Sequence, residues 1–381
     1  MFKIDNATAN PDEPLRTADG PNPGGAFDPI LETVVTAEWL NAVQNELSNF
    51  IEGQGIALDK ANDNQLSIAH DFMLTKMALS NSTQADNPKN FILHSSVYGN
   101  GLHVAVGAAD GVDAYIVTSP DGINWTEQAN PKNVSLFCIE YGNGLFVAVG
   151  AADGSDAYIV TSPDGINWTE QANPKNVSLN AIIYGGGLYV AVGTADGVDA
   201  YIVTSPDGIN WTEQANPKNF SLKGATYGNE LYVAVGAADG VDAYIVTSPD
   251  GINWTEQANP ENGILISIEY GNDLYAAVGS AGGVDAYIVT SPDGINWTEQ
   301  ANPKNENLND ISYGNSSFVA VGNPDGSGAY IVTSADGKNW VEIVNPSNTY
   351  LEGAAFGDGV FVLVGANTDS GAYILTSLRL E

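Results

Sequence analysis

One peptide unit is repeated along most of this chain at a fixed interval of 43 residues. The heptapeptide SPDGINW begins at Ser119, Ser162, Ser205, Ser248 and Ser291, and an altered copy, SADGKNW, begins at Ser334. An aromatic residue followed by glycine recurs at the same interval, at Tyr98, Tyr141, Tyr184, Tyr227, Tyr270, Tyr313 and Phe356. A period of this length indicates an array of supersecondary units, each of which buries its apolar face only against its neighbours.

Each repeat contains the signals of four short strands. Gly142-Asn143-Gly144 is a tight hairpin signal, and Ser162-Pro163-Asp164-Gly165 is typical of a type I turn in which the glycine takes a positive φ. Alternation of apolar and polar residues between these turns predicts the strands. In the second copy they are expected at 136–141, 145–149, 157–161 and 166–171.

Four antiparallel strands in 43 residues are typical of a propeller blade, and the repeat has no 3.6-residue apolar period that would indicate a helical solenoid. Seven units predict seven blades. The last unit ends without a tryptophan strand, whereas one repeat length before the first tryptophan lies Ser82. We therefore expect a strand at 82–85 to complete the blade formed by 356–377, which closes the ring and removes both sheet edges.

The repeated tryptophans are expected to fill the spaces between adjacent blades. Their regular placement on the outer strand favours this structural role over the alternative, a platform on which a base or sugar stacks. The set is Trp125, Trp168, Trp211, Trp254, Trp297 and Trp340.

The net charge of −34 argues against a nucleic-acid partner, because phosphates require lysine and arginine. The alternative interpretation is that this negative charge only keeps the protein soluble. The single cysteine, Cys138, permits no internal disulfide. Neither a signal peptide nor an apolar run of membrane-spanning length is present in the sequence, so we expect synthesis in a bacterial cytoplasm and no membrane insertion.

The first 80 residues precede the repeats and divide into two expected segments. Residues 1–35 are rich in proline and glycine and are expected to be extended, ordering only on docking. In residues 36–80 a helix is expected from Ala37 to about Glu52, capped by Thr36, with a second helix at 64–79. Residues 81–381 form the expected propeller head.

The first expected helix carries a narrow apolar stripe at Leu40, Val43, Leu47 and Phe50. The 3-4-3 spacing of these residues suits association of helices between chains. The alternative is a helix that packs only on its own chain, because two heptads are few.

The repeated turn resembles the Asp-box of sialidase-like propellers, Ser-x-Asp-x-Gly-x-x-Trp, although here glycine follows aspartate directly and the motif is one residue shorter. In that family the box is a structural turn, so the resemblance implies fold and not activity. Sialidases hold their substrate with three arginines, whereas this chain has only Arg16 and Arg379. Its repeated acids are interpreted as symmetric turn residues, and its histidines lack metal-ligand spacing. We expect no enzyme activity, no cofactor and no metal.

A second resemblance lies near the N-terminus. TVVTAEWLNAVQNELSNFIEGQGIALDKANDNQL is similar to a segment common in tail fibres and related adhesion proteins of tailed phages. The matching positions are Thr33, Val34, Val35, Trp39, Leu40, Asn41, Val43, Gln44, Glu46, Gly55, Ile56, Leu58, Gln65 and Leu66. The resemblance implies a virion protein whose residues 1–80 attach to other phage tail or baseplate proteins, and a homotrimer, as is usual for such fibres.

The repeats differ most at the position that follows a repeated leucine. Six residue types occupy seven equivalent sites there: His94, Phe137, Asn180, Lys223, Ile266, Asn309 and Glu352. In a propeller these residues would surround the mouth of the central channel, so we predict that they bind a receptor. Drift at unconstrained positions is the alternative explanation.

These observations together predict a phage tail fibre or tail-tip adhesin that binds a glycan or protein on the bacterial surface. A free carbohydrate-binding propeller lectin is the alternative, and a glycan-degrading enzyme is a third class. The attachment segment discriminates the first two, since a free lectin does not need one, and release of reducing ends would identify the third.

Overall fold

The computed structural model describes residues 37–58, 64–89, 91–112, 114–155, 157–198, 200–238, 243–260, 263–281, 287–324, 328–344, 349–367 and 371–380. The chain forms two compact units, Met1–His70 and Asp71–Glu381. The expected extended segment, residues 1–35, lies outside the described residues. The second unit begins inside a helix, whereas the repeats placed the start of the head at residue 81.

Both expected helices are present, as α1 (Ala37–Gly53) and α2 (Gln65–Ser80). Helix α1 is followed by Gly55, which has a φ of 81°. The side chains of its apolar stripe are only half-buried within the chain. No helix in the described part of the chain is long and apolar enough to cross a membrane.

The repeats form seven sheets of four antiparallel strands each, which confirms the predicted seven-bladed propeller. The innermost strands of the blades are β2 (Leu93–Gly99), β6 (Leu136–Gly142), β10 (Leu179–Gly185), β14 (Leu222–Gly228), β18 (Gly263–Gly271), β22 (Leu308–Gly314) and β26 (Thr349–Gly357). The second strands are β3 (Leu102–Ala109), β7 (Leu145–Ala152), β11 (Leu188–Ala195), β15 (Leu231–Ala238), β19 (Leu274–Ala281), β23 (Ser317–Gly322) and β27 (Val360–Asn367).

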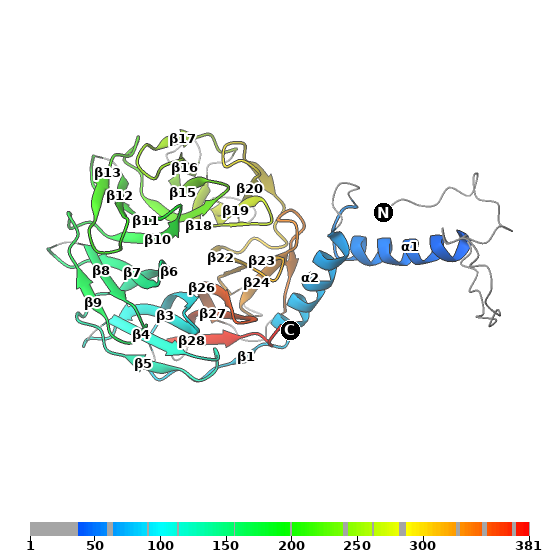
Figure 1. Cartoon of the computed structure of the whole chain (residues 1–381), viewed down its shortest axis with the longest axis horizontal. Helices are drawn as coiled ribbons and strands as arrows, with labels where there is room; N and C mark the ends of the chain where they lie inside the picture. Colours follow the sequence, from blue (N-terminus) through cyan, green and yellow to red (C-terminus); the bar gives the residue numbers. More distant parts are fainter. Residues whose placement is uncertain are drawn as a thin grey trace, which may run out of the picture. The chain divides into compact units, whose positions relative to one another are not determined.

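The third strands are β4 (Ala114–Ser119), β8 (Ala157–Ser162), β12 (Ala200–Ser205), β16 (Ala243–Ser248), β20 (Ile288–Ser291), β24 (Tyr330–Ser334) and β28 (Gly371–Thr376). The outermost strands are β5 (Thr126–Gln128), β9 (Thr169–Gln171), β13 (Thr212–Gln214), β17 (Thr255–Gln257), β21 (Thr298–Gln300), β25 (Val341–Glu342) and β1 (Thr83–Gln84). Each inner strand contacts the inner strands of both neighbouring blades, so the sheets form a continuous ring (Figure 1).

The outermost strand is shorter than expected, because the residues after the glycine belong to the turn. In the second blade, Ile166 N and Asn167 N donate to Asp164 Oδ1 at 2.9 and 2.8 Å, and Ser162 Oγ donates to the same atom. Trp168 Nε1 donates to the Gly165 carbonyl at 3.0 Å. These hydrogen bonds hold the pKa of Asp164 well below its usual range. The repeated heptapeptide is therefore a turn whose polar groups bind one another, with its tryptophan held in place.

The tryptophans lie in apolar clusters between blades, each about 8% exposed. Trp211 packs with Val147 and Val149 of the second blade and with Tyr201 and Val203 of its own. Where the inner strands end, neighbouring blades also approach closely through glycine. A Cβ added to Gly142 would lie 2.2 Å from the ring of Tyr184 in the next blade, so only glycine fits there.

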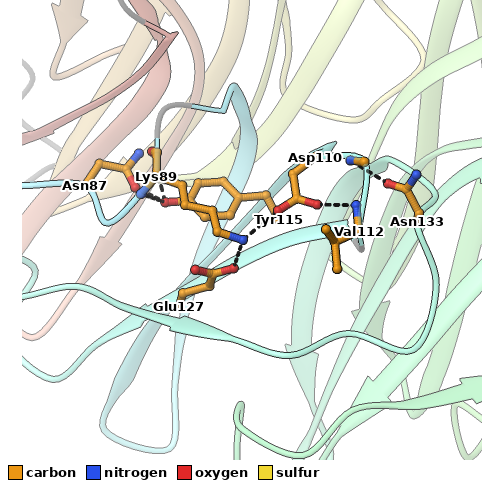
Figure 2. Close-up of polar contacts among 8 residues, drawn as sticks. Asn87, Lys89, Asp110, Val112, Tyr115, Glu127 and Asn133 are labelled. Atoms are coloured by element: carbon orange, nitrogen blue, oxygen red, sulfur yellow. Dashed lines mark hydrogen bonds and ion pairs between the residues drawn. The ribbon is translucent and has the colours of Figure 1, made fainter.

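The seventh blade is completed from the N-terminal side, as predicted. Strand β1 pairs antiparallel with β28, Thr83 opposite Thr376 and Gln84 opposite Leu375. Lys89, which follows β1, donates its amide to Tyr115 Oη at 2.9 Å and pairs its Nζ with Asp110 at 2.6 Å and with Glu127 (Figure 2). Residues 83–89 thus connect the last blade to the first and close the ring.

Candidate binding channel

The propeller has two faces, which the strand directions define. The inner strands begin at the mouth face, which also carries the loops between second and third strands. They end at the turn face, which carries the hairpins between first and second strands and the heptapeptide turns. Leu136 lies opposite Gly150 in the sheet at the mouth face, and Gly142 lies opposite Leu145 at the turn face.

Each of the seven predicted binding residues is the extra residue of a β-bulge. In the second blade the register shifts between Leu136 and Cys138, so Phe137 has no partner on the second strand. The same shift occurs in the other six blades, around His94, Asn180, Lys223, Ile266, Asn309 and Glu352. Bulges bend a strand and redirect a side chain. The sequence therefore varies where the ladder of hydrogen bonds is already interrupted.

All seven of these side chains line one cavity of about 460 Å³ in the central channel. This volume lies within the roughly 300–1,000 Å³ typical of small-ligand pockets. Lys223 is exposed, and the other six are half-buried. The structure thus brings together, from seven blades, every residue that the comparison of repeats selected.

The ring of mouth residues is chemically uneven. His94 and Phe137, in the first and second blades, form an edge-to-face pair with ring centroids 5.8 Å apart. Burial lowers the pKa of His94 and raises that of Glu352 in the seventh blade. Blades seven, one and two therefore present a carboxyl group beside two rings, and Lys223 of the fourth blade carries the positive charge.

Two members of the ring also connect blades. Asn180 Nδ2 donates to the Leu222 carbonyl at 2.7 Å, and Asn309 Nδ2 donates to the Leu351 carbonyl at 2.9 Å. In both cases the acceptor is the residue just before the bulge of the following blade. Asparagine at this position therefore links neighbouring inner strands, a role that the sequence did not indicate.

Below the mouth, the cavity wall contains carboxyl groups that are not part of the repeat. Burial raises the pKa of Glu140 and of Glu269 to about 8. Burial also raises the pKa of Asp310 to about 6, although this carboxylate accepts hydrogen bonds from Ser267 Oγ at 2.6 Å and Ala354 N at 2.8 Å. The interpretation of the acids as symmetric turn residues missed these three. A comparison of the fourth residue after each repeated leucine would have shown the two glutamates.

The second half of α2 belongs to the propeller unit and contacts its turn face. Asn315 Nδ2 donates to the Asp71 carbonyl at 3.1 Å and to Thr75 Oγ1 at 3.0 Å, and Ser316 Oγ donates to Asp71 Oδ2 at 3.1 Å. Leu79 is buried in the apolar cluster of the last two blades. The sequence signal was the Asn-Ser-Ser that replaces Asn-Gly-Leu in the sixth hairpin. The chain therefore enters the propeller on the face opposite the mouth.

The described residues contain no group of three or more histidine, cysteine or acidic side chains placed to hold a metal ion. His103 is buried beside Tyr98, with ring centroids 4.6 Å apart, and lies away from the cavity wall. The equivalent residues of other blades are aromatic, such as Phe146 and Tyr189.

The known proteins to which this chain is similar are β-propellers. A family model described as the DUF6242 beta propeller domain matches residues 162–308. The structure described as "YCF48 bound to D1 peptide" is similar at 18% identity with a TM-score of 0.59, covering 79% of this chain and 96% of that one. The Cps50 (Swd1) β-propeller domain of Myceliophteria thermophila is similar at 8% identity and a TM-score of 0.57, covering 78% and 100%. A comparison with curated proteins gives no match. At these identities the likeness shows the fold alone.

Proposed function

We propose that this chain is a receptor-binding adhesin of a phage tail or a related injection particle. The propeller binds a glycan or protein on the bacterial surface at its mouth face. Residues 1–80 attach it to other tail or baseplate proteins, so the protein is located in the particle. The observation that carries the proposal is the convergence of the seven variable residues, each on a β-bulge, around one cavity.

The position of α2 supports the assignment of receptor binding to the propeller and of attachment to residues 1–80. Because Asp71 and Thr75 contact the hairpin of the sixth blade, the chain approaches the propeller from the turn face. The point at which the N-terminal segment joins the propeller therefore lies on the face opposite the mouth. The resemblance of residues 33–66 to phage fibre segments supplies the kind of particle.

The experiment replaces three members of the ring with asparagine, as Phe137→Asn, Lys223→Asn and Glu352→Asn together. Asparagine already occupies two equivalent bulges and bonds to the next blade, so the fold should be retained. Adsorption to the host should fall by tenfold or more, about 1.4 kcal/mol. The control substitutes Ile123, Ile166 and Ile209 with asparagine, since these are about half-exposed on the turn face. Equal adsorption by the ring variant and the control would refute the site.

A protein receptor is the second candidate, because the structure described as "YCF48 bound to D1 peptide" is a propeller with a peptide ligand. Protease treatment of host cells distinguishes the two receptors: it abolishes adsorption to a protein and leaves adsorption to a glycan intact. A free lectin would bind equally well without residues 1–64. It would also not be incorporated into particles when it retains these residues.

The proposed site binds without turnover. Glu140, Glu269 and Asp310 are the groups that an enzyme would use, since glycoside hydrolysis requires two carboxyl groups in one cleft. Incubation with host polysaccharide, followed by an assay for reducing ends, should give no release above that of the Glu140→Gln, Glu269→Gln variant.

A further inference from the structure

The cavity wall carries two glutamates that the blade itself does not require. Glu140 and Glu269 occupy the fourth position after the repeated leucine. The other five blades carry Val97, Ile183, Thr226, Ser312 and Ala355 at this position. The inner strand therefore packs without a carboxyl group there. Because a carboxyl group is costly to bury, a ligand explains the two glutamates better than packing does.

The two glutamates lie at one level of the channel, on opposite sides of it. Each follows the mouth residue of its own strand, Phe137 or Ile266, by three residues and lies roughly 10 Å deeper, at about 3.3 Å per residue. They line the same cavity from the second and fifth of the seven blades. Burial, and to a smaller extent the negative charge of Glu140, raises the pKa of Glu269. A ligand that reaches this depth therefore lies between two carboxyl groups.

Each of these carboxyl groups has hydrogen-bonding capacity left for a ligand. Glu269 Oε1 accepts a hydrogen bond from Tyr270 N at 3.1 Å, and the Glu140 carboxyl group accepts one from Tyr141 N. Neither group has a further hydrogen bond among the described residues. Burial raises the pKa of both to about 8, so both are mostly protonated at pH 7. A protonated carboxyl group both donates and accepts hydrogen bonds, as a sugar hydroxyl does.

The rest of the wall suits an uncharged ligand. Much of it is apolar, formed by Ile139, Ile182, Ile183, Ile266, Ile268 and Ile311. Among the described lining residues the one lysine, Lys223, is exposed at the rim, so an anionic group at the depth of Glu140 has no lysine or arginine beside it. Asp310, with a pKa of about 6, is mostly ionised at pH 7, but its carboxylate accepts hydrogen bonds from Ser267 Oγ and Ala354 N. A sugar ring, with apolar C–H faces and hydroxyl edges, matches an apolar wall that carries a few polar groups.

We propose that the channel binds a neutral, hydroxyl-rich segment of a receptor glycan, to which Glu140 and Glu269 donate hydrogen bonds from opposite sides as un-ionised carboxyl groups. The inference deepens the proposed function and rests on it, because the cavity is the same. A terminal or an internal segment of the glycan satisfies it equally. Binding should weaken as the pH rises through 8, because the two groups then lose the protons that they donate.

The other titratable groups near the two glutamates have pKa values shifted in their own ways. Burial lowers the pKa of His94, raises that of Cys138 to about 12 and raises that of Tyr189 well above its usual range, so all three are neutral between pH 7 and pH 9. Asp310 is mostly ionised throughout this range. Burial also raises the pKa of Glu352 at the mouth, so the experiment includes a variant of this residue.

The test measures the affinity of the full chain for a neutral oligosaccharide at pH 7 and at pH 9 by calorimetry. The probe is the hexose or N-acetylhexosamine oligosaccharide that binds most strongly on a glycan array at pH 7. With a pKa of about 8, the protonated fraction of one carboxyl group falls about tenfold over this range, so the affinity should fall by at least as much.

Three results would overturn the inference: no binding of any neutral oligosaccharide, an affinity that stays constant, or an affinity that rises with pH. A rise is the result expected for an amine-bearing ligand, because such a ligand pairs with ionised carboxylates.

Variants assign the pH effect to the two glutamates. Glu140→Gln with Glu269→Gln keeps a donor and an acceptor at each position but cannot ionise, so its affinity should be equal at the two pH values. Glu140→Ile with Glu269→Ile copies the third blade and should weaken binding at pH 7 by about tenfold or more, because two hydrogen bonds are lost. The matched control, Glu230→Gln with Asp273→Asn, removes two exposed acids of turn-face hairpins and should keep the pH dependence of the parent, as should Glu352→Gln. Persistence of the pH dependence in the glutamine double variant at 140 and 269 contradicts the inference.

Failure of the proposed function gives a different pattern. If the variant with asparagine at Phe137, Lys223 and Glu352 adsorbs to the host as the parent does, the mouth is not the receptor site and both proposals fall. If that variant loses adsorption while the isoleucine double variant at Glu140 and Glu269 binds the oligosaccharide as the parent does, only the role of the glutamates fails. Melting temperatures at both pH values show that each protein is folded, since ionisation of the two glutamates also destabilises the fold as the pH rises through 8.

Discussion

His103 provides a direct test of how the first blade packs against the seventh. It is 1% exposed, and neither ring nitrogen has a hydrogen-bond partner. Burial lowers its pKa from 6.5 to about 4, while Asp358 raises and Arg379 lowers it by smaller amounts. The equivalent Tyr232 donates its hydroxyl to the carbonyl of Gly185 in the preceding blade at 2.5 Å. Histidine is too short to make this contact, so the first blade lacks it.

The sign and size of the pH effect follow from this shift. A histidine whose pKa is lowered by folding contributes its full stability above pH 6.5, and the contribution is lost as the pH falls towards 4. With these two values, the free energy of unfolding should fall by about 2 kcal/mol between pH 7 and pH 5. His103→Phe, which copies Phe146, should remove this loss, and His103→Tyr should add about 1 kcal/mol through a hydrogen bond to Gly357.

Urea denaturation of the parent and both variants at pH 7 and pH 5 measures the effect. Glu140 and Glu269 titrate in the same range with the opposite sign. Because folding raises their pKa, they favour the folded state below pH 4.5, and this advantage is lost as the pH rises through 8. These carboxyl groups are common to all three proteins, so they cancel in the differences. Parallel pH profiles for the parent and His103→Phe would refute the assignment of the acid loss to His103.

Three further predictions concern packing, closure and assembly. Trp211→Ala should lower the free energy of unfolding by about 3–5 kcal/mol, because it leaves a cavity between the second and third blades, and calorimetry measures the change. Deletion of residues 1–70 should leave a folded propeller, whereas deletion of 1–85 removes β1 and should cause a large fall in melting temperature; equal melting would exclude closure through β1. Finally, if α1 associates three chains, Val43→Asp with Leu47→Asp should convert trimers to monomers in light scattering, and a monomeric parent protein would contradict this prediction.

The fold could be predicted from the sequence because the repeats make it overdetermined. Seven copies of one pattern established the blade, and the missing last strand indicated that a strand near Ser82 completes the ring. The mouth residues could be selected because a residue at a bulge has no partner on the second strand, so its side chain can differ between repeats. A comparison of the repeats makes this variation visible. The docking of α2 was not predicted, since it depends on a hydrogen bond between Asp71 and Asn315, which are far apart in sequence. The carboxyl groups of the cavity wall were missed because their significance lies in burial, which composition does not reveal.

Closure through β1 has a consequence for how the protein is made. Strand β1 is synthesised before the first repeat, but its partner β28 belongs to the last one. The seventh blade can therefore form only after synthesis of the final repeat, while earlier blades already have their neighbours. Ala78 in α2 accepts a hydrogen bond from Leu378 N, so this part of the helix also requires the C-terminal residues. A chain that stops early would thus lack the ring closure and the docked second half of α2 together.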